Sequence, residues 1–276
     1  MDSRNGQGGQ CGFRLAHVYG HVCVLRILAV LEKRFILFVF VSTFLFSQQE
    51  NDVLELGKKI YTESCAVCHG VSGKGDGVVA GNLEVKPRNF TDGKFKVRST
   101  RSGQVPLDED LYRILSRGMG HDNAMPTWSH LSADKKHAVI AYLKTFAPKK
   151  FARQARAKVV PVPPRKKSTR ESIAAGKQWF IDIECTKCHG LSGRADGPST
   201  KTLKDTWGNK IVPPDLSKPW LYIGGSEAED IYRTLSTGLT GSAMPSVEGT
   251  LTEDQTWDLV NFLMHEYIDP GNNAPR

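Results

Sequence analysis

The sequence predicts a chain of two consecutive helical domains built on one repeated design. Three observations support this prediction: a five-residue motif occurs twice, the segments around the two copies match, and the amphipathic stretches in both halves have helical periodicity. The repeat is clearest in DEDLYRILSRG and AEDIYRTLSTG, where Tyr112 and Tyr232 stand 120 residues apart. A length of 276 residues suggests one or two domains, and the repeat favours two of about 100 residues each.

The predicted organisation has five parts, divided where the repeats and the composition change. They are an N-terminal extension with a signal peptide or short anchor at 1–47, a first domain at 48–148, a basic proline-rich linker at 149–170, a second domain at 171–270 and a tail at 271–276.

Each predicted domain carries the motif Cys-x-x-Cys-His, which is the attachment signature of c-type haem. Two thiols about one helical turn apart can each add to a vinyl group of one porphyrin, while the histidine is carried beneath the iron. A zinc site, a thioredoxin-like redox pair, a structural disulfide and coincidence are the alternatives. Duplication inside the matching flanks CAVCHGVSGKGDG and CTKCHGLSGRADG favours haem, so each motif implies one covalently held haem. The residues are Cys65, Cys68 and His69 in the first copy and Cys185, Cys188 and His189 in the second.

Each half also contains a methionine that is followed by proline, Met125 in NAMPTW and Met244 in SAMPSV. These methionines lie 60 and 59 residues after the first cysteine of their own motif. A methionine ordinarily fills a core gap, but the matched offsets favour a shared ligand. Methionine opposite histidine is the axial pair of electron-transfer cytochromes c. Met119, His121 and His130 are rivals in the first half, and we rank them below Met125 because their equivalents in the second half are not ligand types.

With these motifs the chain resembles the class I cytochromes c in their tandem, dihaem form. The resemblance covers about residues 53–146 and 171–268. It rests on a short helix before each Cys-x-x-Cys-His, the Gly-x-Gly-Asp-Gly loop after it, the distal Met-Pro and a closing amphipathic helix. It implies an all-α fold wrapped round each haem. The iron ligands that it implies are His69 with Met125, and His189 with Met244.

Helix signals fall at matching places in the two halves. Gly57 and Gly176 lie inside the first helices, where glycine costs about 1 kcal/mol relative to alanine. The resemblance implies that a small residue at this position lets the first helix cross close to the last one. Expected limits are 53–64 and 173–183 for the first helices, Gly118 and Gly238 at the ends of the middle helices, and Ser132 and Thr252 as N-caps of the last helices.

The two halves differ at Arg88, because PRNF in the first half stands where the second half has PPDL. We consider two roles for this residue, a partner of a haem propionate and a plain surface arginine.

The N-terminal segment has the pattern of a secretory signal peptide: Lys33 and Arg34, an apolar run over 35–46 and a polar exit. The run is shorter than the roughly 20 apolar residues that span a bilayer. An uncleaved anchor is the alternative, since no Ala-x-Ala cleavage site is present. We therefore expect a periplasmic protein, free or anchored to the membrane. Removal of this segment would take Cys11 and Cys23 with it and leave four cysteines, all bound to haem.

The net charge of +8 is distributed unevenly along the chain. The segment from Ala147 to Arg170 carries +9, whereas the N-terminal 47 residues carry +3, the first domain +2 and the second −6. A basic run can bind nucleic acid or anionic lipid, but nucleic acid is disfavoured for an exported protein. We prefer a solvated spacer to a contact with lipid or an acidic partner.

These patterns favour electron transfer: two haem c groups would pass single electrons from a donor protein to an acceptor. Two irons with both axial positions filled leave none for a substrate, and no catalytic residues are predicted. A quinol-oxidising complex, an oxidase or a reductase is the expected kind of partner. The alternatives are a haem subunit of a larger oxidoreductase complex and a dihaem enzyme such as a peroxidase.

Overall fold

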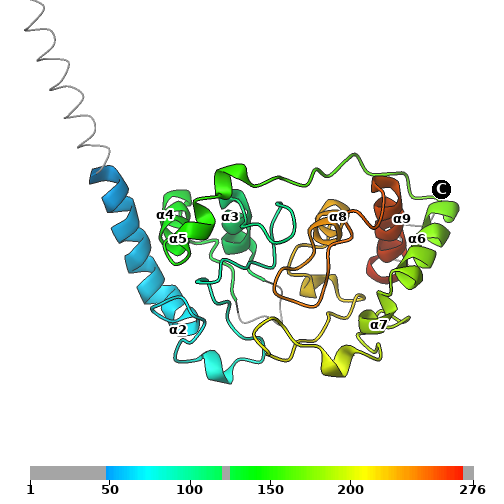
Figure 1. Ribbon diagram of the computed structural model, residues 1–276, viewed down its shortest axis with the longest axis horizontal. Coiled ribbons are helices and arrows are strands. Elements are labelled where there is room, and N and C mark those ends of the chain that lie inside the picture. The colour runs from blue at the N-terminus through cyan, green and yellow to red at the C-terminus, as the bar shows by residue number, and fades with distance from the viewer. Residues whose placement is uncertain (1–47, 120–124, 270–276) are drawn as a thin grey trace, which may run out of the picture. The chain divides into compact units, whose positions relative to one another are not determined.

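The computed structural model describes residues 48–119 and 125–269, and these residues are almost entirely helical or irregular (Figure 1). The chain divides into two compact units, Met1–Asp52 and Val53–Arg276, and both sequence repeats lie in the second. In the described part, β-type pairing is limited to isolated bridges such as Thr100 with Val159. The predicted all-α fold is confirmed.

The helices follow the same order in each repeat. In the first repeat they are a helix over 48–60, a π-helical turn η1 (Tyr61–Cys65), α2 (Ala66–His69), η2 (Ala80–Asn82), α3 (Asp108–Arg117) and α4 (Ala133–Lys144). The connection contains α5 (Pro148–Phe151) and η3 (Gln154–Arg156). The second repeat has α6 (Arg170–Asp182), α7 (Thr186–His189), η4 (Thr200–Thr202), η5 (Pro219–Leu221), α8 (Ala228–Thr237), α9 (Glu253–Leu263) and η6 (Met264–Ile268).

Local capping determines where most of these helices begin and end. Ser132 and Thr252 are the N-caps of α4 and α9, as expected, and their side chains accept hydrogen bonds from backbone N–H groups of the first turn. Gly118 and Gly238 end α3 and α8 with φ of 72° and 65°, a conformation that glycine adopts without strain. The expected starts of the first helices were wrong. Helix α6 begins at Arg170 rather than residue 173 because the Thr169 side chain caps it, and the helix of the first repeat already includes residue 48, the first described residue.

Each repeat has its own hydrophobic core. Helix α6 crosses α9 in the second repeat, and the helix over 48–60 crosses α4 in the first. The crossings are so close that a Cβ atom at Gly57 would fall on the carbonyl oxygen of Ala138, and one at Gly176 on that of Asp258. The close crossing implied by the resemblance is thus present in both repeats.

Arg98 of the first repeat is almost fully buried against the second repeat, with 1% of its surface exposed. Its guanidinium donates to the carbonyl oxygens of Thr237 and Gly238, at the C-terminus of α8, and to Phe95 and Lys96 in its own repeat. Burial lowers the pKa of Arg98 to about 10, so the side chain stays charged at neutral pH. A cation at a helix C-terminus is electrostatically favourable and satisfies its last carbonyls.

Further ion pairs join the two repeats near Arg98. Asp230 on α8 lies 3.0 Å from Arg117 and 3.9 Å from Arg113, both on α3. Arg101 pairs with Glu248 at 2.8 Å. The two repeats therefore meet through defined side-chain contacts.

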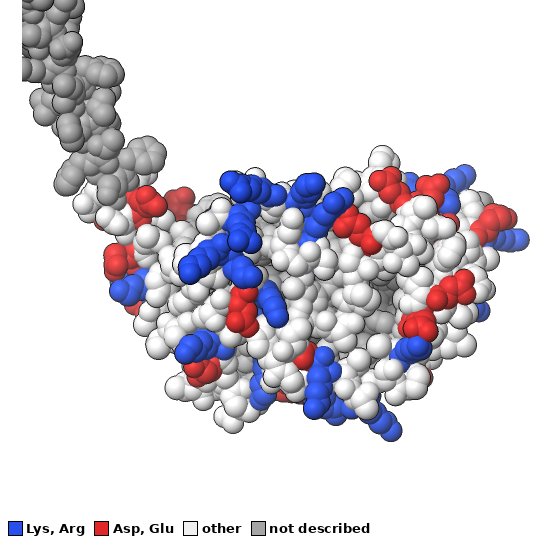
Figure 2. Space-filling view, in the orientation of Figure 1, with Lys and Arg blue, Asp and Glu red and all other residues white. Residues whose placement is uncertain are grey.

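The first part of the basic linker is packed onto the first repeat. Phe151 is buried against Phe95, with ring centroids 5.8 Å apart. Gln154 donates to the Pro106 carbonyl at 2.8 Å, and the backbone N–H of Val160 donates to a carbonyl of the first repeat. Its cations face solvent, as expected, and Figure 2 shows blue side chains gathered over the region of α5. Apolar side chains and backbone hydrogen bonds hold 148–160 against the first repeat, while its cations remain solvated.

Within the described residues, no helix combines the length and apolar character needed to cross a membrane. The predicted signal segment at 1–47 lies outside the described residues.

Candidate haem sites

The two Cys-x-x-Cys-His motifs form one-turn helices of the same construction. Cys65 is the N-cap of α2 and Cys185 the N-cap of α7, and each helix ends at the histidine. Cysteines three residues apart on one turn of helix present their sulfur atoms to the same side. All four thiols are free and partly buried, so neither motif forms the disulfide that was one alternative. Burial raises the pKa of both Cys65 and Cys185 to about 11, which keeps these thiols protonated at neutral pH.

The imidazole of His69 is held with one nitrogen available for a metal. Its Nδ1 lies 3.1 Å from the carbonyl oxygen of Arg88. A carbonyl can only accept, so Nδ1 carries the hydrogen and Nε2 keeps a free lone pair. The ring also stacks on Phe90, with centroids 4.4 Å apart. Burial lowers the pKa of His69 and favours the neutral form, which is the form that binds a metal ion.

His189 has a similar but looser arrangement in the second repeat. Pro214 stands where the first repeat has Arg88, and its carbonyl faces Nδ1 of His189. The contact falls short of hydrogen-bond geometry, so this buried nitrogen has no hydrogen-bonding partner. Burial lowers the pKa of His189 and outweighs the opposite effect of the Pro214 carbonyl. Both histidines can therefore serve as neutral metal ligands.

In each repeat, a tyrosine hydroxyl donates a hydrogen bond to the loop that follows the histidine. The tyrosine lies near the start of the first repeat and near the end of the second. Tyr61, on the first helix, donates to the Gly70 carbonyl at 2.8 Å. Tyr267, after the last helix, donates to the Leu191 carbonyl at 2.9 Å. Phe146 occupies the place of Tyr267 in the first repeat, because Gly73 lies against Phe146 just as Gly193 lies against Tyr267. Burial raises the pKa of Tyr267 to about 12, so this hydroxyl remains a donor throughout the physiological pH range.

We expect Tyr61→Phe to lower the free energy of unfolding by about 1 kcal/mol, because the buried carbonyl of Gly70 loses one of its two hydrogen bonds and keeps only the one from the N–H of Gly73. Adding Phe146→Tyr should restore part of the loss, since Tyr267 shows that a hydroxyl at this position reaches the same loop. Denaturant unfolding of the haem-loaded protein measures both effects. Tyr112→Phe is the control, as the hydroxyl of Tyr112 makes no hydrogen bond to another described residue. Equal losses in Tyr61→Phe and the control would contradict this role.

Met125 and Met244 lie in loops that close in the same way. The carbonyl of Met125 accepts from the N–H of Met119 at 3.2 Å, and that of Met244 accepts from the N–H of Leu239 at 3.1 Å. Each loop folds back on the glycine that ends the preceding helix, and both methionines pack against the core of their own repeat. The backbones of the two methionines are thus held in equivalent ways, and their role as iron ligands stays a prediction. Among the rivals, His130 is exposed beside Trp128, and His121 lies outside the described residues.

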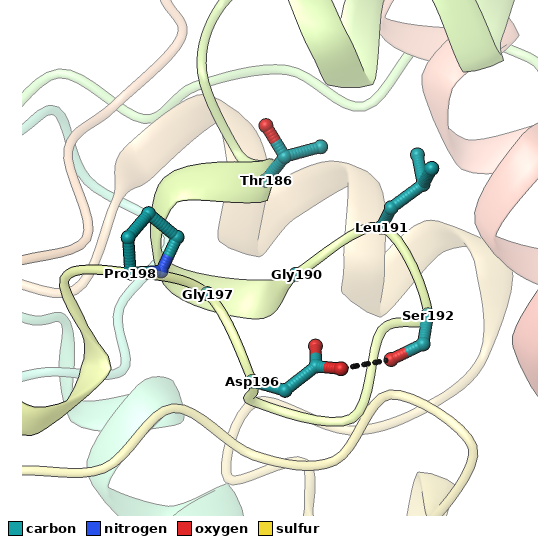
Figure 3. Close-up of a pocket in the computed structure, with 7 residues that line it drawn as sticks. All are labelled: Thr186, Gly190, Leu191, Ser192, Asp196, Gly197 and Pro198. Carbon is teal, nitrogen blue, oxygen red and sulfur yellow. Dashed lines mark hydrogen bonds between the residues drawn. The ribbon is translucent and has the colours of Figure 1, made fainter.

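A shallow hollow opens on the loop that follows the second motif (Figure 3). Ser192 donates to Asp196 at 2.8 Å across the turn, and the side chain of Leu191 is 63% exposed. The hollow belongs to the Cys-x-x-Cys-His loop. It is lined by Thr186, Gly190, Leu191, Ser192, Asp196, Gly197 and Pro198.

Comparison with known proteins assigns the family. Residues 173–266 match the cytochrome c family, and residues 52–143 match cytochrome c oxidase, cbb3-type, subunit III. A chain of the reducing HAO-like protein complex of Kuenenia stuttgartiensis is 38% identical, with a TM-score of 0.71, and the match covers 76% of this chain and 94% of that one. The protein is a tandem, dihaem cytochrome c. No curated protein matches the sequence of this cytochrome.

The residues present fit two covalently bound haem c groups, one in each repeat of the cytochrome. Two free thiols on one helical turn and a buried neutral imidazole form the donor set that haem c attachment needs. The sequence did not lead us to predict that Tyr61 in the first repeat and Tyr267 in the second donate to equivalent loops. The alignment of Tyr61 with Phe180 was the feature of the sequence that could have indicated it. Arg88 has a third role that the sequence did not suggest: its guanidinium lies over the ring of Trp207.

Proposed function

We propose that this cytochrome c carries single electrons between redox proteins through two haems, with His69 and Met125 as axial ligands in the first domain and His189 and Met244 in the second. Haem c supplies the one-electron chemistry when bound. The duplicated geometry carries the proposal, since each repeat presents a neutral imidazole on one loop and a methionine on another loop closed by an equivalent hydrogen bond. Axial methionine and histidine raise the reduction potential and leave no position open for a substrate.

In this proposal the chain positions the haem and controls its surroundings. The thiols of Cys65, Cys68, Cys185 and Cys188 form the covalent links. The proposed domain limits are 48–148 and 171–270, with the linker at 149–170 between them. We further propose a periplasmic location, with a quinol-oxidising complex, an oxidase or a reductase as partner.

A second candidate is a haem subunit of a larger oxidoreductase complex. The similar Kuenenia stuttgartiensis chain belongs to a reducing HAO-like protein complex, and it matches both repeats over most of its length. In such an assembly the same two domains would conduct electrons to a catalytic subunit. Co-purification of the chain from its native membrane and periplasmic fractions distinguishes this subunit from a free carrier.

A redox titration followed in the visible spectrum tests the proposed function. We expect two one-electron steps, low-spin iron in both oxidation states and a weak near-red band from methionine-to-iron coordination. The denatured protein should keep a mass increase of two haems, and Cys68→Ala or Cys188→Ala should weaken attachment in one domain only. High-spin iron that binds cyanide rapidly in the unmodified protein would instead favour a dihaem enzyme.

A further inference from the structure

Trp207 of the second domain is held by three side chains of the first domain. The guanidinium carbon of Arg88 lies 4.3 Å from the ring centroid, and Nζ of Lys94 lies 5.6 Å from it. The indole N–H donates to the carboxylate of Asp92. Figure 1 shows the yellow segment that contains residue 207 meeting the cyan segment near residue 90. Cation–π contacts of this kind contribute about 0.5–2 kcal/mol each, depending on burial.

The six-membered ring of the same indole lies against the loop that carries Met244. The backbone N–H of Thr206 donates to the carbonyl of Gly241 at 3.1 Å. A Cβ atom at Gly241 would lie 2.7 Å from Cη2 of Trp207 and 3.1 Å from Nη1 of Arg88. Gly241 precedes Met244 by three residues, within a loop closed by the hydrogen bond between Leu239 and Met244. Trp207 and Arg88 therefore both lie next to Gly241, in the loop that carries Met244.

Arg88 makes the remaining connection. Its carbonyl oxygen is the acceptor for Nδ1 of His69, while its side chain stacks on Trp207. One residue thus contacts the imidazole of the first domain through its backbone and the tryptophan of the second domain through its side chain. The second domain has no such arrangement, because Pro214 stands at the equivalent position and has no guanidinium.

We propose that Trp207 is a positioning residue through which the second domain sets the reduction potential of the first domain's haem. The inference rests on the proposed function, in which His69 and Met244 are iron ligands. A hydrogen bond from Nδ1 makes a ligating imidazole more basic, and such bonds tune haem potentials. Loosening Arg88 would weaken this bond, reduce the basicity of His69 and raise the potential of the first haem.

Two variants test the contact from its two sides. Trp207→Ala removes the indole ring on which Arg88 stacks. Arg88→Lys keeps the positive charge but loses the planar guanidinium. We expect each variant to raise the potential of the first haem, shifting the equilibrium constant for its reduction by about threefold to tenfold, up to about 59 mV for one electron. The double variant should shift it no further than Trp207→Ala alone, since the contact that Arg88→Lys alters is already absent in Trp207→Ala. Met125→His shows which step of the redox titration belongs to the first haem, because it should change the potential of that haem alone.

A second measurement reports on the hydrogen bond itself. The ring N–H of His69, followed by NMR, should exchange with solvent faster in Trp207→Ala and Arg88→Lys than in the unmodified protein. Trp220→Ala is the matched control, as this tryptophan of the same domain is 51% exposed. Gly241→Ala should act like Trp207→Ala, whereas Gly249→Ala has a similar φ with no atom within 4 Å of the added Cβ and should leave the first haem unchanged.

Equal shifts in Trp207→Ala and Trp220→Ala, additive shifts in the double variant, or unchanged exchange of the His69 N–H would overturn the inference. These failures are separate from failure of the proposed function. The proposed function fails if the unmodified protein lacks the methionine band, whereas the inference fails if the band is present and the first potential does not respond to Trp207→Ala.

Discussion

Gly176→Ala is expected to destabilise the cytochrome by about 3 kcal/mol or more, although alanine is the better helix former. In an isolated helix this substitution would gain about 1 kcal/mol. Here the new methyl group would fall on the carbonyl oxygen of Asp258 and lie 2.7 Å from Cβ of Phe262. Both obstacles belong to the buried helix α9, so α6 would have to move away from it. Gly57→Ala should behave in the same way in the first domain, where the obstacle is the carbonyl of Ala138.

Denaturant unfolding and haem content measure the effect. Gly81→Ala is the matched control, because a Cβ atom there would meet nothing within 4 Å. We expect its free energy of unfolding to change by less than about 0.5 kcal/mol. A gain in stability for Gly176→Ala would show that the two helices are free to separate, and would refute the close crossing.

Met125→Ala and Met244→Ala are each expected to remove about half of the near-red band and to lower the potential of one haem, because thioether ligation raises the potential. Each change should also open one axial position, so that cyanide or imidazole binds to half of the iron. Spectroscopic titration of the two variants, together with the double variant that lacks the whole band, measures these effects.

Met119→Leu is the control in the first domain, since Met119 is the nearest rival thioether in the sequence. It should keep the full band. If Met119→Leu removed half of the band and Met125→Ala left it intact, the ligand of the first domain would be Met119, and the two domains would differ in ligation.

The sequence predicted the features that depend on local signals. The N-caps at Ser132 and Thr252 and the glycines at the ends of α3 and α8 follow from the conformational preferences of single residues. The two Cys-x-x-Cys-His turns follow from a motif whose spacing has a chemical cause. The start of α6 was misplaced because Thr169 was not recognised as its cap.

Contacts between the domains could not be predicted in this way. Arg98 meets Thr237 and Gly238 across about 140 positions of sequence, and Arg88 meets Trp207 across a similar interval. Neither pair shows a periodicity or a motif, since the contact depends on how two folded surfaces meet. The expected asymmetry at Arg88 was visible as a mismatch between repeats, but its partner was not.

The burial of Arg98 at the end of α8 has a consequence for how far the two halves of the chain can be separated. The last carbonyls of α8 accept hydrogen bonds from Arg98, a side chain of the first repeat. A second half that lost its neighbour would expose those carbonyls, and a first half alone would leave a guanidinium without two of its acceptors. We therefore expect each half expressed alone to be less stable than the same half within the full chain.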